Sequence, residues 1–269
     1  YDGRLSSSDG MLHTIDRRSL PPAEKAYYAL TYYLAQNKSG LDVANDSLIR
    51  VAYNYYAKLP KDNLYARCMY YMGFYYSLND SLERANYCLK EAQRTAKEQK
   101  DTATLCLAMT RYSWVVRKTH PEAGLEYAKR VLGLYEKYSK RNAFNIVYNT
   151  LMVCECENFC GNPRRAFSLA QQAEKNALAL GDSTVISDVY QDMAYFAVSL
   201  GDKRSTHFAL LSCRYSDTRF VSKRLMLAKA YEKTGNYHEC INLLDTLRLE
   251  NNGQRYEAFA MRHRAAVKL

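Results

Sequence analysis

The stretch ARCMYYMGFYYSLNDSLERANYCLKEAQRTAKEQ, residues 66–99, carries the clearest structural pattern in the sequence. Its apolar residues recur every three or four positions in two segments, which is the spacing of one helical face. The small residues Gly73 and Ala85 stand one in each segment, where two helices packed about 8 to 10 Å apart would touch. The stretch therefore predicts a hairpin of two helices, and we expect Gly73→Leu to destabilise it by about 1 to 3 kcal/mol through overpacking.

The same two-helix spacing of apolar residues recurs along the chain. Residues 187–220 and 221–254 align without a gap, and looser copies begin near Glu24, Thr102 and Asn145. A single hairpin cannot bury its apolar face alone, so consecutive hairpins stack and share a continuous core. The sequence therefore predicts an all-α fold. The predicted organisation is a lead-in over 1–22, about six hairpins forming one domain over 23–254, and a capping helix or truncated repeat over 255–269.

Composition restricts the class of protein. Apolar residues make up 48% of the 269 residues and charged residues 25%, with only 11 Gly and 5 Pro, which is typical of a folded chain. The longest apolar run is far shorter than the ~20 residues that cross a bilayer as a helix. Eight cysteines without regular spacing predict no disulfide framework and leave the compartment open.

The net charge of +10 favours acidic partners through long-range attraction. Acidic residues are interspersed with the lysines and arginines almost everywhere, so the sequence concentrates no basic patch. We interpret the excess charge as a solvated basic surface. This interpretation disfavours nucleic acid as the partner, since nucleic-acid binding depends on clustered cations that meet phosphates.

The sequence carries no signature of enzyme chemistry. It contains no glycine-rich phosphate loop, no nucleophile elbow and no His-Glu-x-x-His metal motif. Cys154, Cys156 and Cys160 form the densest thiol cluster, but residues two apart point to opposite sides of a helix, which disfavours a metal site. Glu155 and Glu157 are predicted to solvate a helix face. We therefore predict a non-enzymatic protein with no catalytic residue, no metal and no cofactor.

Tyrosine is the compositional outlier, with 25 residues against eight Phe and one Trp. A tyrosine joins a large apolar ring to a hydrogen-bonding tip, which suits a contact surface that is both apolar and wet. Tyr76, Tyr112 and Tyr231 occupy a recurrent packing position and are predicted to be core residues. The other rings leave two alternatives open, a binding surface or ordinary packing between hairpins.

The hairpins resemble the tetratricopeptide repeat family, most clearly at Met69, Met72, Gly73, Tyr76, Ala85, Leu89 and Ala92. The resemblance implies a right-handed superhelical solenoid whose concave groove is lined by the first helix of each repeat and binds a protein or peptide. Carried over position by position, it implies these groove residues: Lys25, Tyr28, Tyr32, Arg67, Tyr70, Phe74, Asn149, Asp188, Gln191, Tyr195 and Lys229. Tyr28, Tyr70 and Gln191 stand where chaperone-docking members carry a basic clamp, so we expect no such clamp here.

The N-terminal quarter is similar to the openings of tetratricopeptide-repeat proteins of Gram-negative gut bacteria. The similar stretches are residues 9–15, PPAEKAYYAL at 21–30 and NDSLI at 45–49. The resemblance implies a lipoprotein or otherwise membrane-associated protein of the cell envelope, attached through an anchor or flanking segment outside this sequence; a cytoplasmic location is the alternative. The expected function is an interaction scaffold in an envelope regulatory protein. The alternative function is a peptide-sensing or nucleic-acid-linked transcriptional regulator domain.

Overall fold

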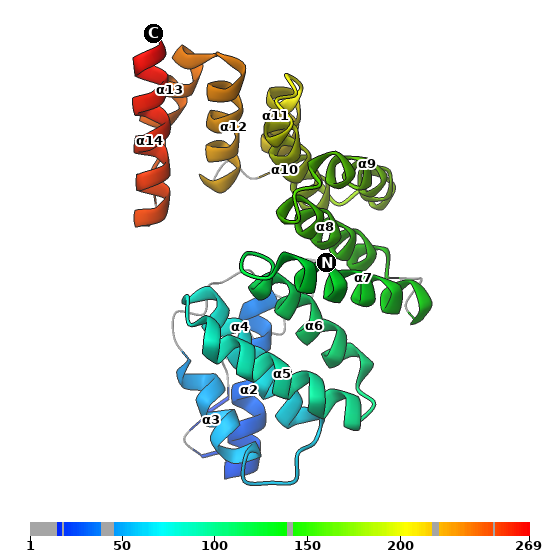
Figure 1. The fold of residues 1–269 in the computed structure, drawn as a ribbon. Coiled ribbons are helices and arrows are strands. Elements are labelled where there is room, and N and C mark those ends of the chain that lie inside the picture. The colour runs from blue at the N-terminus through cyan, green and yellow to red at the C-terminus, as the bar shows by residue number, and fades with distance from the viewer. Residues whose placement is uncertain (1–14, 18, 39–45, 139–141, 217–220, 250) are drawn as a thin grey trace. The chain divides into compact units, whose positions relative to one another are not determined.

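The computed structural model describes residues 15–17, 19–38, 46–138, 142–216, 221–249 and 251–269. This part of the chain consists of α-helices with no strand, which confirms the all-α prediction (Figure 1). The stretch 9–14 of the predicted lead-in lies outside the described residues, and so does Asn45. The helices are α2 (Pro22–Lys38), α3 (Ser47–Tyr56), α4 (Asn63–Leu78), α5 (Leu82–Glu98), α6 (Thr102–Val116), α7 (Pro121–Tyr138), α8 (Ala143–Phe159), α9 (Pro163–Leu180), α10 (Ser183–Ser199), α11 (Ser205–Tyr215), α12 (Val221–Thr234), α13 (Tyr237–Asp245) and α14 (Asn252–Lys268).

The helices fall into two compact units. Unit 1 ends at Val116 and contains α2 to α6; unit 2 begins at Arg117 and contains α7 to α14. The prediction of one domain over 23–254 stays a prediction. Among the described helices, none combines the length and the apolar character that a membrane span requires.

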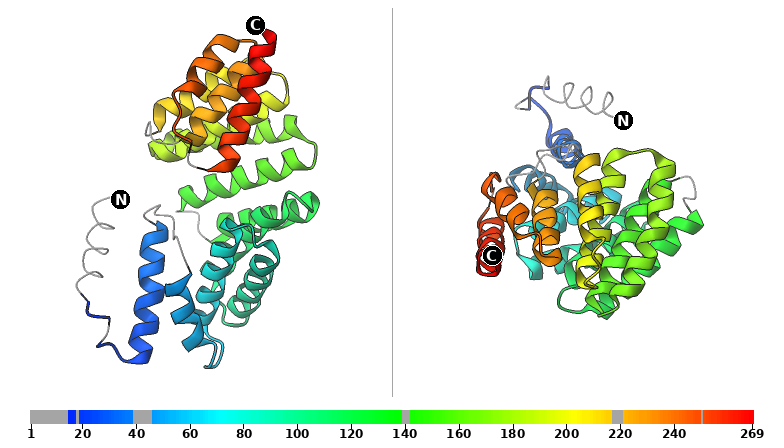
Figure 2. Two further views of the ribbon diagram at one scale, coloured as in Figure 1. Left: turned by 90° about the vertical axis from the view of Figure 1, so that its left-hand side faces the viewer. Right: turned by 90° about the horizontal axis from the view of Figure 1, so that it is seen from above.

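The helix boundaries follow the repeat frame. The predicted repeats start near 24, 66, 102, 145, 187, 221 and 255, and helices α2, α4, α6, α8, α10, α12 and α14 begin within four residues of those positions. In unit 2, each helix from α7 to α14 packs on the next, and the first helices α8, α10, α12 and α14 also pack on one another (Figure 2). The positions at which the helices begin thus agree with the repeat starts that the sequence predicts.

Small residues let the helices of a hairpin approach. A Cβ atom at Gly73 of α4 would lie 2.7 Å from Cγ of Leu89 on α5, so any larger residue there would force the two helices or the Leu89 side chain to shift. In unit 2, alanines of α9 such as Ala166 and Ala173 are fully buried in the same cluster as Met193 and Phe196 of α10. Pairing small residues with large ones fills the space between close helices at crystal-like density.

The junction of α9 and α10 shows how local chemistry ends one helix and begins the next. Gly181 adopts a left-handed conformation, φ +68°, which stops α9 without the penalty that a Cβ atom would bring. The carboxylate of Asp182 then accepts hydrogen bonds from the backbone amides of Thr184 and Val185. These amides lack partners in the first helical turn, so the carboxylate stabilises the start of α10.

Helix α14 is the last helix of the described part of unit 2. Ala258, Met261 and Ala265 lie on one side of α14 and are buried against residues of α12 and α13, among them Ala228 and Leu244. Large apolar residues of α14 also lie on the opposite side of the helix, where they are exposed. Helix α14 therefore covers its neighbours with one face and presents a second apolar face to solvent.

Candidate functional site

The predicted groove residues of α2 are mostly buried. Tyr28 and Tyr32 are 5% and 7% exposed, and their rings stack with centroids 5.8 Å apart. The guanidinium of Arg17, from the segment before α2, lies 5.4 Å and 5.0 Å from the two ring centroids. Lys25 is exposed. In α2, the chain's own N-terminal segment thus covers the aromatic pair.

The predicted residues of α4 follow the same trend. Tyr70 is 8% exposed and its ring lies 6.3 Å from that of Phe74. The Phe74 ring is covered by the guanidinium of Arg111 of α6 at 3.9 Å. Arg67 is exposed and lies 3.9 Å from a carboxylate oxygen of Asp101. Most of these groups already have partners within unit 1.

In unit 2 the predicted residues lie in three different environments. Asn149 is 4% exposed, and its amide donates to a backbone carbonyl one turn earlier in α8, so it serves that helix. Gln191, Tyr195 and Lys229 are half-buried, and the Lys229 ammonium lies 5.5 Å from the Tyr195 ring centroid. Asp188 belongs to a network of charged groups that extends over three first helices.

Asp188 of α10 joins α8 to α12. Its carboxylate accepts a hydrogen bond from the hydroxyl of Tyr148 at 2.6 Å and pairs with the ammonium of Lys223 at 2.5 Å. The same ammonium donates to the Ser187 hydroxyl at 2.7 Å. Lys223 is only 5% exposed, and a buried ammonium is costly unless it is paired in this way.

A second ion pair lies on the neighbouring part of the same face. The guanidinium of Arg117 lies 2.9 Å from the carboxylate of Glu155 on α8, and Arg117 is 7% exposed. A Cβ atom at Gly124 would lie 2.9 Å from Cα of Arg117, so this glycine permits the close passage of the arginine backbone. Burial raises the pKa of Glu155, while the charges of Arg117 and Lys118 act in the opposite direction.

Asp192 lies between these two ion pairs, one turn after Asp188 on α10. Burial raises its pKa well above the ordinary value, the carboxylates of Glu155 and Asp188 raise it further, and Arg117 and Lys223 lower it. Both of these cations already pair with the other two carboxylates. Within the described residues, no side chain makes a hydrogen bond or close ion pair with the Asp192 carboxyl. Asp192 is therefore the one acid of the group without a cation of its own.

We call Tyr148, Glu155, Asp188, Asp192, Arg117 and Lys223 the charged face of unit 2. Of these residues, the resemblance-based assignment contains only Asp188. The sequence does contain a signal that could have identified this face. Asp188 and Asp192 lie one turn apart on a predicted first helix, and Lys223 lies near the start of the next first helix. Strong pKa perturbation with specific charged partners is typical of functional sites.

The prediction that Glu155 and Glu157 solvate a helix face is wrong. Glu155 forms the ion pair described above, and Glu157 is 1% exposed. Burial alone would raise the pKa of Glu157, but hydrogen bonds from Lys129 and Asn162 and the charge of Arg165 hold it below its ordinary value. Because these partners come from α7 and the start of α9, Glu157 fastens a hairpin and lies apart from the charged face.

The cysteines have no ligand arrangement in the described chain. All eight are free thiols, and Cys154 and Cys156 are fully buried. Burial raises the pKa of the Cys154 thiol, which keeps it protonated and unreactive. No cluster of three His, Cys, Asp or Glu side chains that could hold a metal ion occurs among residues whose positions are described.

Several solved structures share this architecture. A Rap protein complexed with Competence and Sporulation Factor superposes with a TM-score of 0.72 at 15% identity, over 95% of this chain and 71% of that one. The apo form of the quorum sensor NprR from B. thuringiensis gives 0.64 at 14% identity, over 95% and 73% of the two chains. A STAND protein with a tetratricopeptide repeat sensor from Pyrococcus horikoshii gives 0.66 at 16% identity, over 91% of this chain and 39% of that one.

The fold is that of a tetratricopeptide-like repeat protein. The sequence itself matches no protein-family model and no curated protein. At these identities the likeness concerns the fold, and function has to be argued from the site.

Proposed function

We propose that the protein is a non-enzymatic interaction module that binds a protein or peptide on the charged face of unit 2. The observation that carries this proposal is Asp192, a half-buried carboxyl beside two ion pairs and without a cation of its own. A partner that brings an amine or guanidinium to Asp192 would supply the missing charge. A charge-assisted hydrogen bond of this kind is stronger than one between neutral groups.

The surrounding network gives the face a fixed geometry. Tyr148, Asp188 and Lys223 connect three helices, and the buried hydroxyls of Ser187 and Ser212 hydrogen bond to each other's backbone carbonyls at 2.6 Å and 2.8 Å. Groups held in this way lose little conformational freedom when a ligand binds, which favours affinity.

Two of the solved structures with a similar fold support the proposal that this protein binds a partner. The Rap structure contains Competence and Sporulation Factor, and NprR is a quorum sensor, so the peptide-sensing alternative gains support from the same comparison. The location in the cell envelope, and the link to an envelope or nucleic-acid-linked regulator, are proposals that rest on the sequence. Fractionation of cells that express the native gene tests the location.

The binding proposal is tested by selection from a displayed random-peptide library against the full chain. Selected peptides are then measured by fluorescence anisotropy against wild type, Asp192→Asn and the matched control Glu136→Gln, whose carboxylate is exposed on α7. We expect Asp192→Asn to weaken binding about tenfold, the effect of losing one charge-assisted contact of ~1.4 kcal/mol, and Glu136→Gln to have no effect. Failure to select any peptide, or equal affinity for wild type and Asp192→Asn, refutes the proposal.

A further inference from the structure

The acids and the cations of the charged face lie at different depths. The side chains of Arg117 and Lys223 are only 9% and 6% exposed. The carboxylates that pair with them, those of Glu155 and Asp188, belong to side chains that are 27% and 31% exposed. The cations are thus more deeply buried than their partners, and a ligand that approaches this face meets carboxylates first.

Other ionisable groups near this face do not change that arrangement. Lys118 is exposed, and the Lys229 ammonium lies 5.5 Å from the Tyr195 ring centroid; within the described residues, neither forms an ion pair with a carboxylate of the charged face. Burial first, and the charge of Asp192 among other causes, raise the pKa values of Tyr148 and Cys154 on α8. Both groups therefore stay neutral at the pH values at which a carboxyl titrates.

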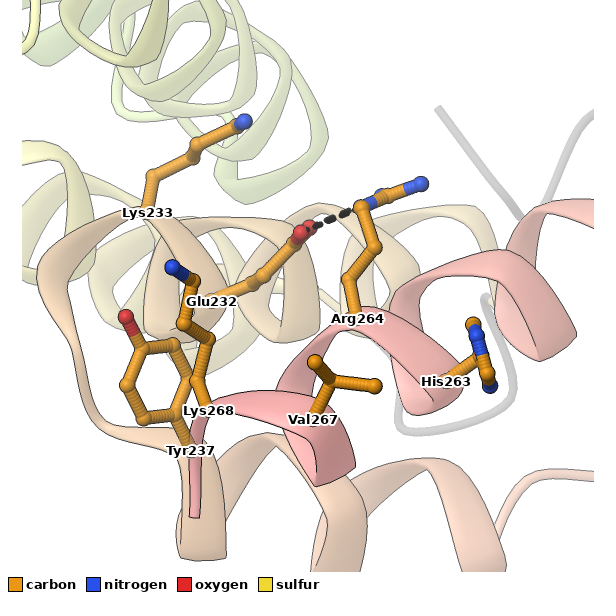
Figure 3. Close-up of a pocket in the computed structure, with 7 residues that line it drawn as sticks. All are labelled: Glu232, Lys233, Tyr237, His263, Arg264, Val267 and Lys268. Carbon is orange, nitrogen blue, oxygen red and sulfur yellow. Dashed lines mark hydrogen bonds and ion pairs between the residues drawn. The ribbon is translucent and has the colours of Figure 1, made fainter.

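Two other buried carboxylates of unit 2 show how such a group is normally accommodated. Glu232 on α12 is 8% exposed, and the guanidinium of Arg264 donates two hydrogen bonds to it, at 2.5 Å and 3.0 Å (Figure 3). Glu157 on α8 pairs with the ammonium of Lys129 at 2.9 Å. Each of these acids has a cation of its own, whereas the part of the chain that the structure describes supplies none to Asp192.

The surroundings of Asp192 favour its neutral, protonated form. The carboxyl is half-buried and lies near the negative charges of Glu155 and Asp188, while the cations Arg117 and Lys223 are engaged by those two acids. Burial and like charges both stabilise a carboxylic acid against ionisation. In agreement, the pKa of Asp192 is raised well above its ordinary value, by burial first and by the two carboxylates next.

A basic side chain of a bound peptide competes with that proton. A guanidinium or ammonium forms its strong hydrogen bond with the ionised carboxylate, because the neutral acid offers no negative charge. We propose that Asp192 is an exchange site, which takes either a proton or the basic side chain of a bound peptide. When the peptide binds, the O–H bond of the Asp192 carboxyl breaks, its proton passes to solvent, and the carboxylate pairs with the peptide cation.

This inference rests on the binding proposed above and adds the condition that controls it. Because a proton and the peptide compete for one carboxylate, each weakens the binding of the other by the same factor. Affinity for a basic peptide therefore rises with pH until Asp192 is fully ionised in the free protein.

The test is the pH dependence of peptide binding to the full chain. Peptides from the selection described above are synthesised with blocked termini, and those whose charged residues are only Arg or Lys are used. Such peptides keep their charge between about pH 5 and about pH 9, so a pH effect comes from the protein. Fluorescence anisotropy gives Kd for wild type, Asp192→Asn and the matched control Glu136→Gln, and far-UV circular dichroism verifies their helices at each pH.

We expect wild type to bind about tenfold more tightly at the alkaline end of this range than at the acidic end, where its affinity approaches that of Asp192→Asn. Asparagine has no proton to exchange, so the affinity of Asp192→Asn should stay constant, while Glu136→Gln should follow wild type. Calorimetry in buffers of different ionisation enthalpy should show proton release on binding to wild type and none on binding to Asp192→Asn.

The possible failures are distinguishable. The exchange site is overturned, and peptide binding stands, if Asp192→Asn is weaker at the alkaline end but wild-type affinity does not change with pH. The same conclusion follows if wild type and Asp192→Asn share one pH dependence, since the proton then comes from another group. If no peptide is selected, or if wild type and Asp192→Asn bind equally at the alkaline end, the proposed function falls together with the exchange site.

Discussion

Gly73→Ala is a sharp test of how the hairpin of unit 1 is packed. Replacing glycine by alanine inside a helix normally stabilises it by about 0.5 to 1 kcal/mol, because the unfolded chain loses freedom. Here the new Cβ atom would lie 2.7 Å and 2.9 Å from Cγ and Cδ2 of Leu89 and 3.3 Å from the carbonyl oxygen of Ala85. Leu89 is fully buried and cannot turn away freely. Overpacking of this kind costs about 1 to 3 kcal/mol.

Gly133→Ala is the matched control. Gly133 lies within α7, is exposed, and its added Cβ would meet nothing within 4 Å. This control should therefore show the helix gain alone, about 0.5 to 1 kcal/mol of stabilisation. Gly73→Ala combines the same gain with the clash, so we expect it to be neutral to about 2 kcal/mol destabilising. The difference between the two variants isolates the clash.

Urea unfolding followed by far-UV circular dichroism measures both changes in the free energy of unfolding. A second arm places Gly73→Ala in a Leu89→Ala background, where the clashing atoms are gone. Gly73→Ala should become stabilising there, by an amount close to that of Gly133→Ala. If Gly73→Ala stabilises the otherwise wild-type chain as much as Gly133→Ala does, the close approach of α4 and α5 is wrong.

Four further predictions concern titration, buried charge and thiol access. The folded protein holds the Asp192 proton more tightly than the unfolded chain does, so the free energy of unfolding falls as rising pH removes that proton. Asp192→Asn should therefore raise the free energy of unfolding at neutral pH and reduce its fall with rising pH. Urea titrations at several pH values measure both effects. Lys223→Met should lower stability by about 1 to 3 kcal/mol, seen as a lower Tm, since it leaves polar partners unpaired. Hydrogen bonds from Arg94 and Lys61 lower the pKa of Glu91 to about 2. The ionised Glu91 therefore adds its full contribution to the free energy of unfolding above the ordinary carboxyl pKa, and that contribution is lost as the pH falls toward 2. Glu91→Gln should remove this part of the acid sensitivity, as measured by the same urea titrations. The half-buried Cys160 and Cys213 should react with a thiol reagent before the six buried cysteines do, and equal rates for all eight would contradict the burial pattern.

Sequence reasoning located the hairpins because their signals are local. Asp182 caps α10 through amides two and three residues away, and Gly181 ends α9 through its own backbone conformation. The pairing of Gly73 with Leu89 also lies within one 34-residue unit. Such features repeat with the period of the fold, so a single sequence reveals them.

The charged face depended on the tertiary structure. Arg117, Glu155, Asp192 and Lys223 come from segments spread over more than a hundred residues, and no spacing in the sequence joins them. Their grouping follows from the rotation of α8, α10 and α12 about their own axes, which side-chain packing between hairpins sets. Tyr28 and Tyr70 of unit 1, which the resemblance assigned to a groove, are buried by contacts within that unit, among them the cover that Arg17 gives to Tyr28. The sequence alone determined the order and length of the helices through local signals, and only the packed structure decided which side of each helix is left to meet a partner.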